Sequence, residues 1–137
     1  MLSMDDRFLY FANWLHGDIR QYDVSDPARP KLTGQLWLGG VLGKPNDGTR
    51  QLSGGPNMLQ LSYDGSRLYV SNSLYSTWDN QFYPELQSWL LRIDCDPNGG
   101  MQIDPEFFLD FSDRPGGPAR AHEVRLQGGD CTTEIFQ

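Results

Sequence analysis

The chain has 137 residues, of which 38% are hydrophobic, 21% charged and 12% aromatic, and its formal net charge at pH 7 is -7. This length accommodates one domain with a core, and the acidity argues against a nucleic-acid partner, because phosphate backbones are bound by clustered Lys and Arg. No run approaches the roughly eighteen apolar residues of a membrane span, and the start MLSMDD lacks the regions of a signal peptide.

The first part of the chain predicts three strands. Residues 7–14 are rich in aromatic residues, residues 18–24 alternate apolar with polar side chains, and residues 31–40 form a third run that ends in glycines. Residues 41–56 have almost no periodicity, so we expect a long loop of functional or variable character. The 15 Gly and 9 Pro favour turns over long helices.

The second part predicts four more strands and a terminal one. Strands are expected at residues 58–62 and 67–73 around a tight turn, then within 88–95 and 101–111, with one more strand and a tail in 119–136. Only residues 83–93 have a pattern compatible with a helix, and their β-branched and aromatic end favours a strand.

An internal repeat dominates the sequence. Ser3–Leu15 superposes without gaps on Ser62–Leu74 at an offset of 59 residues. The matched pairs are Ser3 and Ser62, Asp5 and Asp64, Leu9 and Leu68, Tyr10 and Tyr69, Asn13 and Asn72, and Leu15 and Leu74. Propeller blades recur every ~40–50 residues, and the long loop accounts for the excess. We expect an all-β fold that is part of a β-propeller, with blade-like units at about 1–40 and 56–112 and a terminal strand and tail at 119–137.

Two blades cannot close a ring, since propellers generally have ~4–8. Only MLSM precedes the first turn, so the first unit lacks most of an innermost strand. Exposed blade edges predict self-association of the isolated chain.

Three long segments resemble the C-terminal part of the selenium-binding protein family, whose members include the methanethiol oxidases. They are NWLHGDIRQYDVSDPARPKLTGQLWLGG, GGPNMLQLSYDGSRLYVSNSLYSTWDNQFYP and AHEVRLQGGDCTTEIF. The similarity is weakest over residues 41–53, where the family has a longer insertion. The resemblance implies a seven-bladed propeller roughly three times as long, of which this chain is the last third.

The activity implied by the resemblance is the oxidation of methanethiol by dioxygen and water to formaldehyde, hydrogen sulfide and hydrogen peroxide, with copper as the cofactor. The isolated chain is then expected to be inactive as an oxidase. The alternative is a non-catalytic selenium-binding or protein-interaction module, and the fold alone does not decide between them. A cytoplasmic location is expected, and a periplasmic one stays open for a bacterial parent, because a signal would precede this chain.

His16 and His122 are the candidate copper ligands that the resemblance indicates. Two isolated histidines are weak evidence alone, but imidazole is a good copper donor, and the remaining ligands would lie outside this chain. Glu123 either accepts the other N–H of the His122 imidazole or forms an exposed ion pair with Arg125.

Four aromatic residues provide a candidate substrate pocket, or else cover one blade: Tyr75, Trp78, Phe82 and Tyr83. Asp5 and Asp64 begin equivalent turns, where we expect them to accept hydrogen bonds from backbone amides.

Cys95 and Cys131 lack CxxC spacing and specify neither a metal site nor a disulfide framework, so we expect thiols in a reducing compartment. In the family that the chain resembles, the selenium-reactive cysteine lies in the N-terminal part, so neither inherits that role.

Overall fold

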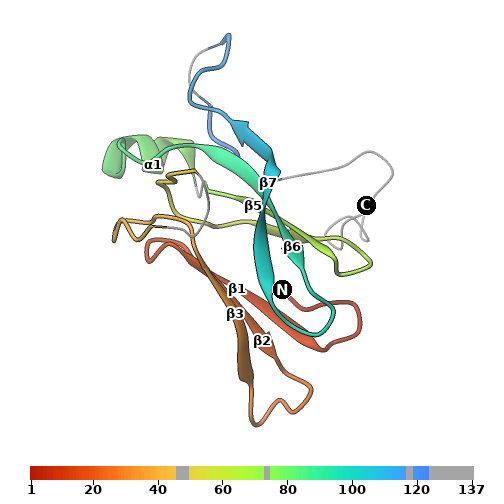
Figure 1. Cartoon of the computed structure of the whole chain (residues 1–137). Coiled ribbons are helices and arrows are strands. Elements are labelled where there is room, and N and C mark those ends of the chain that lie inside the picture. Colours follow the sequence, from red (N-terminus) through yellow and green to blue (C-terminus); the bar gives the residue numbers. More distant parts are fainter. Residues whose placement is uncertain (46–49, 73–74, 117–118, 124–137) are drawn as a thin grey trace.

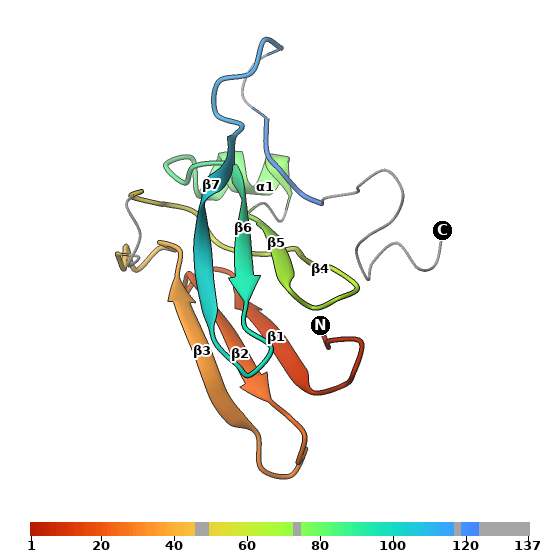
Figure 2. The same ribbon diagram turned by 45° about the vertical axis from the view of Figure 1, so that its right-hand side comes forward.

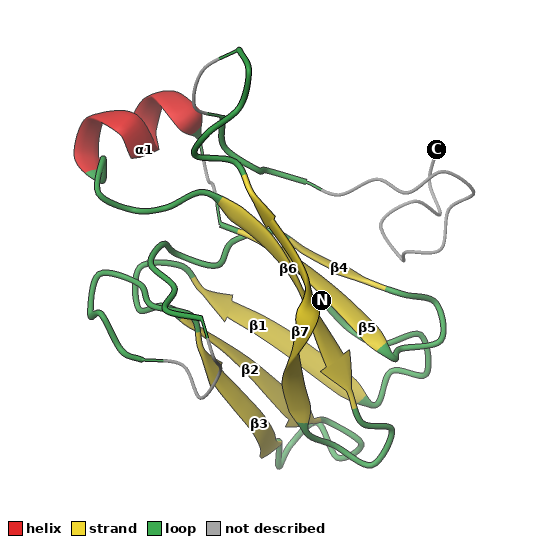
Figure 3. Ribbon diagram, turned by 45° about the horizontal axis from the view of Figure 1, so that its top comes forward, coloured by secondary structure: helices red, strands yellow, loops and turns green. Residues whose placement is uncertain are grey.

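A computed structural model describes residues 1–45, 50–72, 75–116 and 119–123. It contains two antiparallel sheets and one short helix (Figure 1). The first sheet has the order β1 (Phe8–Asn13), β2 (Asp18–Asp23), β3 (Lys31–Trp37). The second has the order β4 (Leu59–Leu61), β5 (Arg67–Ser71), β6 (Trp89–Cys95), β7 (Met101–Asp110). The helix α1 (Ser76–Phe82) lies beyond one end of the strands (Figure 3). The predicted all-β fold built from blade-like antiparallel sheets is confirmed.

The sequence repeat is also a repeat of hydrogen bonds. The Ser3 hydroxyl donates to Asp5 at 2.6 Å, and the Ser62 hydroxyl donates to Asp64 at 2.6 Å. Each hydroxyl accepts the amide of the first residue of the next strand, at 2.9 and 3.0 Å. The residue after each aspartate has a positive φ, 57° in the first turn and 71° in the second. The two sheets are therefore equivalent units, although residues 73–74 of the second copy lie outside the described residues.

The core lies between the two sheets, which Figure 2 shows packed side by side. Alternation along β1 buries Phe8 and Tyr10, while Phe11 stays 51% exposed on the opposite face. The largest fully buried side chain is Trp89 at the start of β6. The first sheet thus has one covered face, toward the second sheet, and one open face.

The helix α1 was not predicted, whereas the strand favoured at the end of residues 83–93 is confirmed by β6. Residues 83–93, the only stretch with a helix-compatible pattern, contain the start of β6, and the helix precedes them. Trp78 and Phe82 are four residues apart on α1 with ring centroids 4.4 Å apart. Pro84 follows the helix and prevents its continuation. The sequence has no helix signal here, because the segment is rich in aromatic residues, which are typical of strands.

Two expected features fall partly outside the described residues. The loop of residues 41–56 contains no strand where the structure describes it, and residues 46–49 are not described. Residues 119–123 form no strand, and the rest of the predicted terminal strand and tail is not described.

Candidate functional site

One end of the two sheets gathers the predicted site residues, and we call it the helix end. The turn from β1 to β2 lies there, since Asn13 pairs with Asp18. So does the connection from β5 through α1 to β6, and so does the end of β7, because Trp89 pairs with Asp110. His16 belongs to the first of these turns. The carbonyl of His122 accepts a hydrogen bond from the hydroxyl of Ser71, the last residue of β5.

His16 stands on the open face of the first sheet. Its side chain is 43% exposed, and its Nδ1 lies 2.9 Å from Oδ1 of Asp18. Its ring packs against Trp37 of β3, with centroids 4.9 Å apart. Because the imidazole contacts Asp18 through Nδ1, this contact does not use its other nitrogen, Nε2. An imidazole held in this way has one nitrogen available to a ligand.

Asp18 is a fully buried carboxylate with four hydrogen-bond donors around it. Oδ1 accepts a hydrogen bond from Asn13 Nδ2 at 2.8 Å and also contacts the His16 imidazole. Oδ2 accepts hydrogen bonds from Arg20 Nε at 2.7 Å and from Gln35 Nε2 at 2.6 Å. Burial alone raises the pKa of a carboxyl, but the hydrogen bonds, led by that of Arg20, outweigh burial and lower the pKa of Asp18 to about 2.

The role of Asp18 was missed in the sequence. A carboxylate only accepts hydrogen bonds, so the contact of 2.9 Å suits the form of His16 that has its proton on Nδ1. Only the short spacing of His16 and Asp18 in HGD signalled the pair. The contribution of Gln35 from β3 had no local signal, because it depends on the pairing of two strands.

His122 is exposed at the same end but in different surroundings. Its ring is stacked on Tyr75, with centroids 6.4 Å apart and planes 16° apart. Glu123 is exposed beside it, and Arg125, one of its two expected partners, lies outside the described residues. The structure thus places His16 against the first sheet and His122 beside the second. Within the part of the chain that the structure describes, no three His, Cys, Asp or Glu side chains gather as a metal site.

The four aromatic candidates for a substrate pocket differ in exposure and in contacts. Trp78 and Phe82 are 46% and 51% exposed on α1, and Tyr75 is 66% exposed. Tyr83 instead contacts Trp14 edge to face, with centroids 5.6 Å apart. A pocket of about 500 Å³ beside α1 is lined by other residues: Ser76, Asn80, Pro84, Leu86, Gln87, Ser88, Ser112, Ala119 and Arg120.

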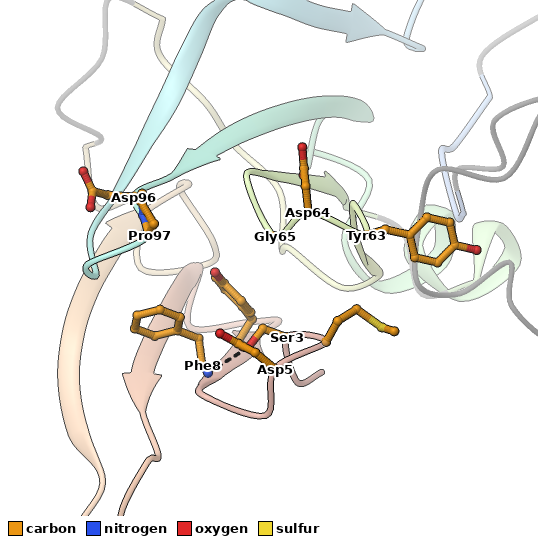
Figure 4. A pocket seen from close by; sticks show the side chains of 10 residues that line it. Ser3, Asp5, Phe8, Tyr63, Asp64, Gly65, Asp96 and Pro97 are labelled. Carbon is orange, nitrogen blue, oxygen red and sulfur yellow. Dashed lines mark hydrogen bonds between the residues drawn. The ribbon is translucent and has the colours of Figure 1, made fainter.

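A smaller pocket of about 180 Å³ lies at the opposite end, between the two repeated turns (Figure 4). As predicted, Asp5 and Asp64 accept backbone amides there, from Arg7 at 3.2 Å and Ser66 at 3.0 Å. Both carboxylates thus accept hydrogen bonds within their own turns.

Cys95 is buried, and burial raises the pKa of its thiol to about 11. Such a thiol is a weak nucleophile at neutral pH. Cys131 lies outside the described residues. Across the described residues, no helix combines the length and apolar character needed to cross a membrane.

Comparison with known proteins gives a consistent set of matches. The family model described as 56kDa selenium binding protein (SBP56) matches residues 1–137. Selenium-binding protein 1 of Arabidopsis thaliana and the methanethiol oxidase of Homo sapiens are each 51% identical to the chain over 99% of its length. An X-ray structure of a hypothetical selenium-binding protein from Sulfolobus tokodaii superposes with a TM-score of 0.82 at 51% identity, covering 96% of this chain and 28% of that one. The chain spans about a third of the length of the curated relatives, 32% and 34%.

Proposed function

Because this chain belongs to the 56 kDa selenium-binding protein family, we propose that it serves as the C-terminal part of a seven-bladed propeller enzyme that oxidises methanethiol. The products are formaldehyde, hydrogen sulfide and hydrogen peroxide, and the co-substrates are dioxygen and water. The proposal is supported by 51% identity to the methanethiol oxidase of Homo sapiens along 99% of the chain. The isolated chain, which holds two repeat units, is inactive as an oxidase under this proposal.

In this proposal His16 and His122 contribute to a copper site whose remaining ligands lie outside the chain. The observation that carries it is the His16 imidazole, exposed and fixed through Nδ1 by a buried carboxylate. Imidazole nitrogen suits copper, and a carboxylate on the far nitrogen is the usual support of a ligating histidine. Bound copper would supply the one-electron chemistry that the reaction of a thiol with dioxygen requires.

The residues beside His122 supply the apolar surroundings in this proposal. Tyr75 stacks on the His122 ring, and Trp78 and Phe82 form a second aromatic pair on α1, the helix that begins after Tyr75. Aromatic side chains suit a small apolar thiol such as methanethiol. Glu123 orients His122 through its second nitrogen.

The test uses a chimera in which residues 1–137 replace the matching third of the Homo sapiens methanethiol oxidase, here called the ring chimera. Copper content and hydrogen peroxide production from methanethiol are measured for the wild-type sequence, His16→Ala, His122→Ala and a Gln102→Ala control on the exposed edge of β7. We expect both histidine variants to lose copper and peroxide production while the control keeps them. Full copper and activity in both histidine variants would overturn the copper site.

A second candidate function is a non-catalytic binding module. It is favoured by the exposed aromatic residues of α1, Trp78 and Phe82, which resemble a protein contact surface more than a closed pocket. A ring chimera that contains no copper and produces no peroxide would favour this function.

A further inference from the structure

We propose that Asp18 is a positioning residue, which keeps the proton of His16 on Nδ1 and so presents Nε2 as the metal-binding nitrogen; this rests on the proposed function. The contact that carries it joins His16 Nδ1 and Asp18 Oδ1 at 2.9 Å. An unsupported imidazole exchanges its proton between both nitrogens, whereas a fixed acceptor at one nitrogen selects one form.

The environment of Asp18 fits this role. The carboxylate has no exposed surface, while the His16 side chain is 43% exposed, so water does not compete at the carboxylate but reaches the ring. Arg20 and Gln35 both bind Oδ2, which fixes the carboxylate plane and leaves Oδ1 for the imidazole and the amide of Asn13. The acceptor is therefore rigid before any ligand arrives.

The second repeat unit has no carboxylate at the position equivalent to Asp18. Asn72 is the repeat partner of Asn13, and the residue across the strand pair from it is Trp89. Asn72 there accepts a hydrogen bond from the Trp89 backbone amide at 2.8 Å, so the corresponding strands meet with Trp89 at the position of Asp18, although they are joined through α1 rather than by a short turn. Burying a carboxylate costs free energy unless it is paired and hydrogen-bonded, as Asp18 is through Arg20, Gln35 and Asn13. Of the two described units, the one with the carboxylate also has a histidine two residues before it.

Backbone hydrogen bonds of the β1–β2 turn fix the position of His16. Gly17 donates its amide to the Asn13 carbonyl at 2.7 Å, and its own carbonyl accepts the Leu38 amide at 2.7 Å. The backbone on the C-terminal side of His16 is thus fixed against the first sheet. The contact with Trp37 limits ring rotation further.

The experiment observes His16 directly in the metal-free ring chimera labelled with ¹⁵N-histidine. The His16 signals are identified by their loss in His16→Ala. We expect the wild-type sequence to show a single form protonated at Nδ1, and Asp18→Asn to show a mixture or the opposite form. Copper titration should give an affinity about 10–100-fold lower for Asp18→Asn, and Asp23→Asn, a second carboxylate change on β2, should match the wild type.

Further variants separate positioning from stability. Gln35→Leu removes a different donor to Asp18, so it should lower the melting temperature yet leave the His16 protonation form unchanged. Asp18→Glu keeps the charge and carries the test if Asp18→Asn does not fold, with a shifted His16 signal expected. An unchanged His16 form and copper affinity in the folded Asp18 variants would overturn this inference. Retained copper in His16→Ala would instead overturn the proposed copper site, whatever the signals of His16 show.

Discussion

Gln21 and Gly100, which are 79 residues apart, join the two sheets through a hydrogen bond of 2.7 Å from the Gly100 amide to Gln21 Oε1. The same oxygen accepts the Thr33 hydroxyl at 2.8 Å, and Gln21 Nε2 lies 3.1 Å from the Tyr10 hydroxyl. Gln21 is fully buried. One side chain thus satisfies polar groups of β1, β3 and the turn between β6 and β7.

Replacing Gln21 by Leu should therefore destabilise the protein strongly. The variant removes the side-chain partner of the Gly100 amide and of the Tyr10 hydroxyl, while the Thr33 hydroxyl keeps the backbone carbonyl of residue 21. We expect a loss of about 2–4 kcal/mol in the free energy of unfolding. Urea denaturation of the ring chimera, followed by fluorescence, measures it. Gln102→Leu, at an exposed glutamine of β7, is the matched control and should change stability by less than about 0.5 kcal/mol. Equal midpoints for the two variants would contradict the role of Gln21.

The two repeat units were predictable because their signals are local. Ser3 and Asp5, like Ser62 and Asp64, are two residues apart, and their hydrogen bonds form within a single turn. The environment of Asp18 was not predictable, since Gln35 reaches it from another strand. The sequence therefore indicated His16 as a candidate ligand, but the carboxylate that holds it follows from the pairing of β2 with β3.

Acid should weaken the second repeated turn through Asp64. Hydrogen bonds from the Ser62 hydroxyl, the Ser66 amide and the Ser66 hydroxyl lower the pKa of Asp64 from 3.8 to about 2. A lowered pKa means that the folded state favours the ionised form, so this contribution is complete above about pH 4 and is lost as the pH falls toward 2. Asp64→Asn should flatten the fall in melting temperature over that range. Glu85→Gln, at an exposed carboxylate, corrects for the lost charge and should leave the slope as it is.

Cys95 should resist thiol reagents in the folded chain. Burial raises the pKa of its thiol from 9.0 to about 11, so at pH 7.5 it forms about 100-fold fewer thiolates than an ordinary cysteine. In the Cys131→Ser chain, where Cys95 is the one remaining thiol, we expect slow reaction with Ellman's reagent and rapid reaction in 6 M guanidinium as an unfolded reference. Because the folded state favours the neutral thiol, its contribution to stability is complete below about pH 9 and is lost as the pH rises toward 11. Rapid labelling under native conditions would contradict the burial of this thiol.

Gly17 should tolerate no side chain beside His16. Its φ is +91°, and an added Cβ would lie 2.5 Å from the Cα of Gly40. Gly17→Ala in the ring chimera should lower the melting temperature by several degrees, consistent with a loss of about 2–4 kcal/mol, and should reduce copper content together with it. Gly116→Ala is the control, because no atom lies within 4 Å of its added Cβ. A native melting temperature for Gly17→Ala would contradict the close approach of Gly17 to Gly40.

The open face of the first sheet should make the isolated chain self-associate. Phe11 and Leu32 are 51% and 52% exposed there, next to strands whose opposite face is buried. Apolar groups on an uncovered sheet favour pairing with a second copy. Sedimentation of the isolated chain should show dimers or larger species, and Phe11→Ser with Leu32→Ser should shift the distribution toward the monomer. Leu109→Ser, on β7 of the second sheet and 42% exposed, should shift it less. The ring chimera should remain monomeric with either set of changes, because there we expect the preceding blade to cover the open face of the first sheet. A monomeric isolated chain would contradict the prediction that this exposed face drives self-association.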